Sequence, residues 1–209
     1  MIKKINKLLN FNKDTNENEI SKKIDNLYAS LDTESIQIEL GNDIIKFNET
    51  LRNCIDKFRT KTKEKYGFIL PAVRIRDRQN LQANEVIIKI NNKTVIELFL
   101  IPTEAKVEQE FNEGLKKLFN DFIEDIFTCE IMERYILLVR KKNSYLIWNL
   151  TNTYTIIELK DILTSLLKNK KSLNNISYIM EQIGQISLSN GHPYYVEPQK
   201  VAKELLKIL

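Results

Sequence analysis

The segment YGFILPAVRIRDRQNLQANEVIIKINN, residues 66–92, decides the fold of this chain. Gly67 is well placed to end a preceding helix, because glycine readily adopts the left-handed conformation found after helix C-termini. Residues 68–76 predict a strand, and Pro71 indicates an edge or first-residue position because proline cannot donate to a sheet. The pair Asn91-Asn92 then joins two further strands, since asparagine tolerates the left-handed backbone of a tight hairpin.

The residues before this segment predict a tether, a strand and a helix. Residues 1–34 include a polar, asparagine-rich stretch at 10–18 with little to bury, which is typical of a tether. Residues 35–40 alternate polar and apolar side chains and predict a half-buried strand. A helix then runs up to Gly67, with three apolar side chains on one face: Leu51, Ile55 and Phe58.

The rest of the chain predicts a mainly helical part. Residues 111–127 carry a wide apolar face, which continues after a break near Thr128 on three further residues: Ile131, Tyr135 and Leu138. Residues 156–167 predict another amphipathic helix, and Ser172 is placed to cap the next one. A last helix runs through Leu209.

These elements predict an α+β fold, with a small sheet-plus-helix subdomain followed by a mainly helical subdomain. We expect the tether at residues 1–34, the α/β subdomain at residues 35–110 and the helical subdomain at residues 111–209. With 209 residues, 43% of them hydrophobic, the chain can bury a real core.

The charge of the chain selects no partner by itself. Its 32 Lys and Arg against 28 Asp and Glu leave a net charge of +4 and a pI near 8.9. That is far short of the concentrated basic field expected of a nucleic-acid binder. The densest basic runs, at residues 61–65 and 140–142, fit solvated helix ends or turns. We therefore expect no nucleic-acid partner.

Few side chains are arranged for catalysis or metal binding. Cys54 and Cys129 lie on segments with helical spacing and predict two buried thiols in a reducing compartment. His192 is the only histidine, and no Cys-x-x-Cys or His-x-x-x-His spacing offers a zinc site. No Gly-x-Ser-x-Gly motif or glycine-rich phosphate loop is present, so we expect no enzyme, no metal and no cofactor. The paired acids fit exposed helix charges: Glu124 with Asp125, and Glu130 with Glu133.

No stretch of the sequence is long and apolar enough to span a membrane. The longest apolar runs, at residues 95–101 and 135–139, are far shorter than the roughly 20 residues that a spanning helix needs. The N-terminus begins like a signal peptide but lacks the continuous apolar stretch and the cleavage site. We therefore expect a cytoplasmic protein with no direct membrane insertion.

Two arginines form the most unusual polar feature of the chain. Arg74 and Arg76 occupy alternate positions of a predicted strand, so both side chains point to the same face. One interpretation, which we favour, is that they pair with neighbouring carboxylates. The other is a site for an anion or an acidic partner, because the guanidinium fork matches carboxylate or phosphate.

The segment from Tyr66 to Asp77 resembles the signature of the FHIPEP family, the cytosolic part of the flagellar and type III protein-export gate. Residues 36–41 are similar to a family strand that ends in Leu-Gly, and residues 159–181 are similar to a helical pair of the family. The resemblance covers most of residues 35–209. It implies a structural role for the signature positions: Gly67, Phe68, Pro71, Arg74, Ile75, Arg76 and Asp77.

The chain also departs from the family pattern. We expect a reduced member without the transmembrane half and without the far C-terminal subdomain. Between Ile101 and Phe111 the family inserts a small subdomain that helps to form the docking cleft for chaperones and cargo, and here only a short connection remains. The usual docking residues therefore have no counterparts.

The resemblance implies a non-enzymatic docking or scaffold component of a type III or flagellar export apparatus. We expect its partners to be other export-apparatus subunits or a second copy of the chain in a homo-oligomer. Residues 1–31 correspond to the family's linker, which packs on a neighbouring subunit, so the expected partner-binding residues are Ile2, Ile5, Leu8 and Leu9. The alternative is a regulatory nucleic-acid-binding protein that uses the helical half, with charge from the loop at residues 168–171.

Overall fold

The computed structural model describes residues 35–189 and 195–209. Within Ser35–Leu209 these residues form one compact unit. The predicted tether, with its four expected partner-binding residues Ile2, Ile5, Leu8 and Leu9, lies outside the described residues, and so does His192.

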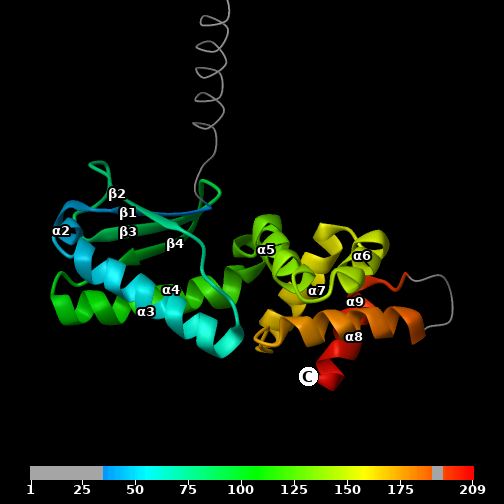
Figure 1. The fold of residues 1–209 in the computed structure, drawn as a ribbon. Helices are drawn as coiled ribbons and strands as arrows, with labels where there is room; N and C mark the ends of the chain where they lie inside the picture. The colour runs from blue at the N-terminus through cyan, green and yellow to red at the C-terminus, as the bar shows by residue number, and fades with distance from the viewer. Residues whose placement is uncertain (1–34, 190–194) are drawn as a thin grey trace, which may run out of the picture. The chain divides into compact units, whose positions relative to one another are not determined.

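A four-stranded mixed sheet stands at the N-terminal side of this unit (Figure 1). Its strands, in the spatial order β2-β1-β3-β4, are β1 (Ile36–Leu40), β2 (Val73–Asp77), β3 (Glu85–Ile90) and β4 (Lys93–Phe99). β1 runs parallel to β2 and antiparallel to β3, and β3 and β4 form a hairpin. Asn91 and Asn92 make its turn with φ values of 49° and 65°, as predicted. β2 lies at the sheet edge, which agrees with the proline before it.

One face of the sheet lies over two long helices, α3 (Asn48–Tyr66) and α4 (Glu104–Ile126), as Figure 1 shows. The short helix α2 (Asn42–Ile45) precedes them. β1 is buried along its whole length, including Gln37 at 5% and Glu39 at 3% exposure. The prediction of a half-buried strand was therefore wrong: β1 is an inner strand, and long side chains from its neighbours cover its polar positions.

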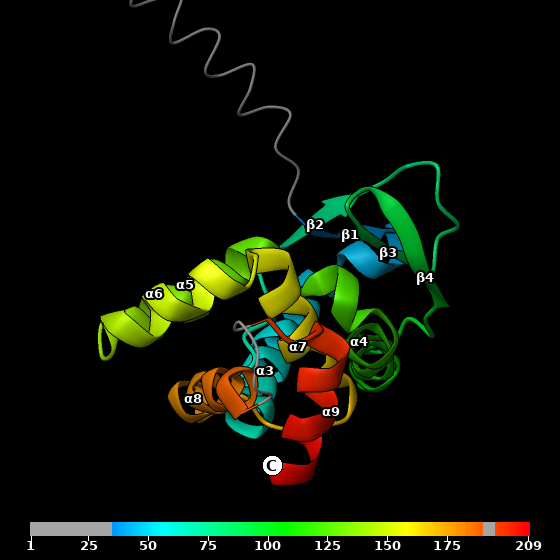
Figure 2. The ribbon, with the colours of Figure 1, turned by 90° about the vertical axis from the view of Figure 1, so that its right-hand side faces the viewer.

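The helical part follows α4, and its described residues form five further helices. They are α5 (Cys129–Arg140), α6 (Ser144–Thr153), α7 (Ile156–Lys168), α8 (Ile176–Ser189) and α9 (Pro198–Ile208). α7 packs against α4, α5 and α9, while α8 packs against α6 and α9 (Figure 2). The predicted α+β fold is confirmed. The predicted boundary at residue 110 falls inside helix α4, twelve residues before its kink at Phe122, and the division into two subdomains stays a prediction.

Several details differ from the sequence-based expectations. The strand predicted at residues 68–76 begins only at Val73. Ser172 does not cap α8, which begins at Ile176, and the carboxamide oxygen of Asn175 accepts from the N–H of Tyr178 instead. Helix α6 was not predicted, because its apolar residues lie on more than one face: Ile147 and Leu150 are buried, whereas Tyr145 and Trp148 are exposed.

Two residues expected in the interior lie at the surface. Leu138 is half exposed, since the buried stripe of α5 runs through Met132, Ile136 and Val139. Cys129 is exposed at the first position of α5, and only Cys54 is buried; neither thiol forms a disulfide.

Candidate functional site

The first part of the family-like signature begins with Gly67, which ends α3 in the left-handed conformation with φ of 65°. A Cβ atom at this position would lie 2.5 Å from the backbone nitrogen of Asn174 and 2.7 Å from the carbonyl carbon of Leu173. Real Cβ atoms do not approach backbone so closely. The position therefore requires glycine both for its conformation and for the close approach of the loop between α7 and α8.

The helical part caps the end of α3. Three donors reach carbonyl groups there: Asn174 Nδ2 donates to Glu64 at 2.8 Å, the N–H of Leu173 to Tyr66 at 2.8 Å, and Tyr135 Oη to Gly67 at 2.5 Å. These carbonyls have no partner within their own helix. Burial raises the pKa of Tyr135 to about 12, so its hydroxyl stays protonated and able to donate at neutral pH.

Phe68 is fully buried and belongs to a cluster of rings that we call the aromatic cluster: Phe58, Tyr66, Phe68, Phe119, Phe127 and Tyr135. The Phe68 ring lies 5.7 Å from Phe119 on α4 and 5.9 Å from Phe127, which follows α4. Phe127 in turn stacks on Tyr135 of α5 at 5.8 Å. Contacts of this kind add to the large apolar area that each ring buries. The aromatic cluster thus connects α3 and the signature to α4 and α5.

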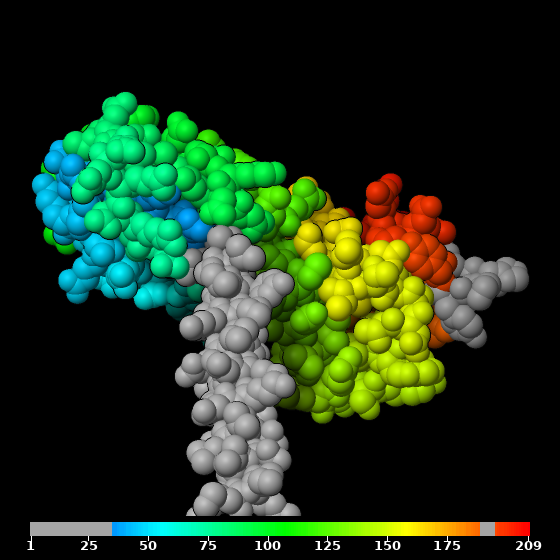
Figure 3. Space-filling view, turned by 90° about the horizontal axis from the view of Figure 1, so that it is seen from above, coloured from blue at the N-terminus to red at the C-terminus, as the bar shows by residue number. Residues whose placement is uncertain are grey.

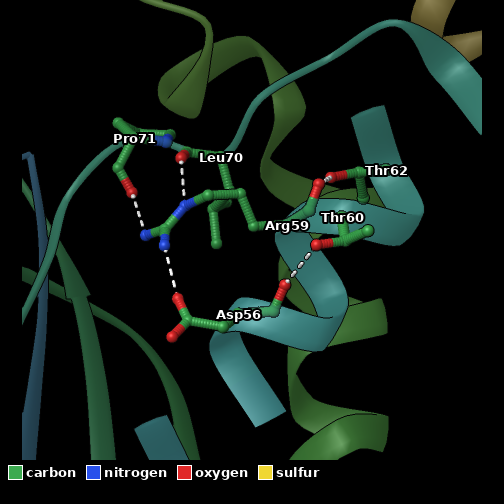
Figure 4. Close-up of polar contacts among 6 residues, drawn as sticks. All are labelled: Asp56, Arg59, Thr60, Thr62, Leu70 and Pro71. Carbon is green, nitrogen blue, oxygen red and sulfur yellow. Dashed lines mark hydrogen bonds and ion pairs between the residues drawn. The ribbon is translucent and has the colours of Figure 1, made fainter. Parts of the chain in front are cut away.

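Arg59 of α3 fixes the backbone of Leu70 and of the signature residue Pro71 (Figure 4). Its Nε donates to the carbonyl of Leu70 at 3.0 Å and its Nη2 to the carbonyl of Pro71 at 3.3 Å. The third arm of the guanidinium group binds Asp56 at 2.7 Å. The two carbonyls are directed to α3 and not to a neighbouring strand, which explains why β2 begins only after Pro71.

The second part of the signature, residues 74–77, lies on the edge strand β2. Ile75 is half buried and packs against the core. Arg74 and Arg76 are exposed on the other face, opposite Gln37 and Glu39 in register, and Asp77 is also exposed. The structure therefore confirms that the two arginines share one face of a strand.

A buried carboxylate on this face of the sheet belongs to Glu39, and sequence reasoning missed its burial. Glu39 is buried and accepts from Arg78 Nη1 and Lys89 Nζ, each at 2.8 Å. A buried carboxylate needs such partners because desolvation of its charge is costly. In the sequence, the position of Glu39 between two apolar residues of β1 was the signal that could have indicated its burial. Pairing of Arg74 and Arg76 with neighbouring carboxylates stays a prediction.

The remaining candidate groups take part in surface contacts. Glu124 pairs with Lys168, and Glu130 pairs with Arg134 at 2.6 Å, so these acids are exposed helix charges as expected. Lys170 binds the side chain of Asn120. Two lysines of the loop that the nucleic-acid hypothesis relies on are thus engaged within the chain.

The reactive groups that remain are the two thiols, Cys54 and Cys129, and the possible metal ligands. Burial is the main cause that raises the pKa of the Cys54 thiol, which disfavours the reactive thiolate. Within residues 35–189 and 195–209, no group of three or more His, Cys, Asp and Glu side chains could hold a metal ion. None of the described helices combines the length and apolar content needed to cross a bilayer.

The signature and the whole four-stranded sheet lie inside the region that a sequence-family model matches. The model of the FHIPEP family matches residues 3–113, a little over half of the chain. The chain belongs to the FHIPEP family. The match includes all seven signature positions, both the buried ones and those on β2. A comparison with curated proteins gives no match.

Solved structures of FHIPEP-like fold extend the similarity into the helical part. The chain is similar to the CdsV protein of Chlamydia pneumoniae, with 14% identity and a TM-score of 0.64 over 80% of this chain and 64% of that one. It is also similar to the MxiA protein of Shigella flexneri, with 17% identity and a TM-score of 0.57 over 82% and 63%. A third similar structure is the nonameric EscV cytosolic domain from the type III secretion system, with 12% identity and a TM-score of 0.60 over 82% and 63%.

At these identities the likeness is one of fold. The chain spans less than two thirds of the length of each of these solved structures. It shares their arrangement of sheet and helices over most of its own length.

Proposed function

We propose that this FHIPEP-family chain is a non-enzymatic component of a type III or flagellar-like export apparatus that acts in the cytoplasm through contacts with other proteins. The observation that carries the proposal is the signature at residues 67–77, which occupies a defined place in the fold within the region matched by the family model. In this proposal residues 1–34 are a linker, and residues 35–110 and 111–209 are the two subdomains of a docking module.

The similar folds support protein partners and a homo-oligomer. The EscV cytosolic domain and the SctV-C protein are described as nonameric, and a further similar structure is a complex of CdsV with CdsO. We therefore propose self-association and binding to export-apparatus subunits for this chain as well. The residues proposed to contact a neighbouring copy are Ile2, Ile5, Leu8 and Leu9, whose spacing places them on one face of a helix.

Light scattering tests the role of the N-terminal residues. We expect the full chain to form an oligomer, and a chain without residues 1–18 to have a lower mass. Replacing Ile2, Ile5, Leu8 and Leu9 together by Ser should have the same effect, because it removes the apolar face and keeps the length and charge. The matched control replaces Asn10, Asn12 and Asn16 by Ser, which leaves that face intact.

Two results contradict the proposal. An oligomer whose mass is unchanged by the truncation and by the four-residue substitution excludes the N-terminal face as the contact. A full chain that is monomeric and captures no export-apparatus subunit from the cytosol of its native cell excludes the docking function itself.

A further inference from the structure

The turn between α5 and α6 gathers exposed apolar side chains. Residues 137–148, which we call the α5–α6 tip, contain four large hydrophobic residues with half or more of their surface exposed: Leu137 at 52%, Leu138 at 50%, Tyr145 at 71% and Trp148 at 62%. Figure 2 shows this turn at the left-hand end of the α5–α6 pair, and Figure 3 shows the hairpin at the surface of the described chain. Exposed apolar groups that gather in this way mark contact surfaces.

The same tip is uniformly basic. Arg140, Lys141 and Lys142 follow one another at the end of α5, and all three are exposed. Residues 134–157 contain no Asp or Glu. Among the ion pairs of the described residues, none involves these three cations. A surface of this charge attracts an anionic partner.

The two aromatic rings are available for contact because the core does not use them. Tyr145 and Trp148 stack on each other with centroids 6.2 Å apart and planes 20° from parallel. The opposite face of α6 is buried through Ile147 and Leu150. Tyr and Trp side chains prefer the boundary between an apolar phase and water, because each combines an apolar ring with a polar N–H or O–H group.

We propose that the α5–α6 tip binds the surface of an anionic lipid bilayer. The lysines and the arginine contact the headgroup phosphates, the rings of Tyr145 and Trp148 lie at the headgroup level, and the two leucines reach the acyl boundary. This contact is peripheral, involves no spanning segment and is separate from the proposed docking function.

A lipid surface fits this tip better than a nucleic acid or an acidic protein segment. Bases could stack on the rings, but the two exposed leucines of the same tip offer a nucleic acid little. A partner helix binds in a groove, whereas Lys141 and Lys142 form the turn at the free end of the α5–α6 pair (Figure 2). Aliphatic, aromatic and cationic side chains within twelve residues are the combination that peripheral membrane contacts use.

The chain supplies its own probe, because Trp148 is its only tryptophan. The experiment uses the full chain with vesicles of phosphatidylcholine, either alone or mixed with phosphatidylserine. We expect co-sedimentation and a blue shift of the Trp148 emission with the anionic vesicles, and neither with the neutral ones. Both signals should weaken as salt is added, because salt screens the attraction.

Matched variants locate the site. Lys141→Ala combined with Lys142→Ala should weaken binding about 25-fold, which is about fivefold for each cation removed near the surface. Leu137→Ser combined with Leu138→Ser should reduce the emission shift at unchanged charge. The control, Lys61→Ala with Lys63→Ala, removes two exposed cations from α3 and should leave binding within about twofold of the original.

Several outcomes overturn the proposal. Equal binding to neutral and anionic vesicles would show that the cations do not contribute to binding. An unshifted Trp148 emission with anionic vesicles would show that the tip does not contact the lipid. A loss in the control as large as in the tip variant indicates an effect of net charge alone. An emission shift caused by polyglutamate or single-stranded DNA, and not by anionic vesicles, assigns the tip to an acidic protein or to a nucleic acid.

Discussion

The two parts of the FHIPEP signature are neighbours in sequence but differ in their surroundings. Residues 67–71 are held by α3 through Arg59, by α5 through Tyr135, and by the aromatic cluster around Phe68. Residues 74–77 lie on an edge strand, where only Ile75 faces the core and the charged side chains are exposed. One short motif thus contains a packed connection and an exposed strand.

This difference shows which positions the fold itself constrains. The first part connects the sheet-containing part with the helical part, so a change there must disturb both. The second part carries side chains that are not needed for packing, with the exception of Ile75. The charged side chains of residues 74–77 are therefore the part of the signature that is accessible to other molecules. Substitutions in the first part should therefore cost more stability than substitutions in the second part.

Phe68→Ala should produce the largest loss of stability. The ring is fully buried between Phe119 and Phe127, and its removal leaves a cavity. We expect the free energy of unfolding in urea to fall by about 3–5 kcal/mol. The neighbouring Ile69→Ala is the control, because Ile69 is exposed and should change stability by less than about 0.5 kcal/mol. Similar losses for both variants would contradict the packed connection.

Gly67→Ala should cost about 2–4 kcal/mol, from the left-handed backbone and from overpacking against the loop at Leu173 and Asn174. The matched control is Gly184→Ala in α8, where the new methyl group meets only Leu146 at 3.5 Å and Leu150 at 3.9 Å. That change should be neutral or stabilise the chain by up to about 1 kcal/mol, because alanine is the better helix former. Equal effects at the two glycines, measured by urea denaturation, would contradict this explanation.

Tyr135→Phe should keep the stacking on Phe127 and lose the hydrogen bond to Gly67, at a cost of about 1 kcal/mol at neutral pH. Burial raises the pKa of Tyr135 to about 12 in the folded chain, against about 10 when unfolded. The stability tied to the neutral phenol is therefore complete below pH 10 and is lost between about pH 10 and 12, by up to about 2–3 kcal/mol.

The original chain and the Tyr135→Phe variant should reverse their order of stability as the pH rises. The original chain is the more stable at pH 8, and the Tyr135→Phe variant should be the more stable near pH 12. Denaturation curves of both chains are recorded at the same pH values. The difference between their free energies of unfolding is then free of the titration of the other groups, which the two chains share. Parallel stability curves across this range would show that Tyr135 is not buried as described.

Arg76→Ala should have the smallest effect, because the side chain is exposed on the edge strand. We expect a change in the free energy of unfolding of less than about 0.5 kcal/mol. A loss above about 1 kcal/mol, measured by urea denaturation, would mean that the second part of the signature also holds the fold. The comparison between the two parts would then fail.

Local sequence signals predicted the sheet-containing part well. Gly67, Pro71 and Asn91-Asn92 each act through backbone conformation, which one residue type can reveal. The strand start at Val73 was missed because it depends on Arg59, which is remote in sequence from the carbonyls that it binds. The burial of Glu39 was missed for the same reason, since Arg78 and Lys89 come from two different neighbours of β1.

The helical part was harder to predict, because tertiary contacts decide which side of each helix is buried. Leu138 and Trp148 are apolar residues that the structure leaves exposed. Among the candidate site residues, Gly67 at the end of a helix and residues 74–76 on a strand could be placed from sequence, whereas Phe68 and Pro71 were expected in that strand and lie before it. The contacts that join the signature to Tyr135 and Asn174 could not be predicted, because they bring together residues from distant parts of the chain.

The first part of the signature couples the sheet-containing part to the helical part. The most direct test of this coupling is urea unfolding of the full chain followed by the hydrogen exchange of the amides of two elements: β1 in the sheet and the buried helix α7. We predict one shared midpoint, because the aromatic cluster and the caps on α3 join the two parts. Loss of protection in α7 at urea concentrations where the β1 amides are still protected would contradict the coupling.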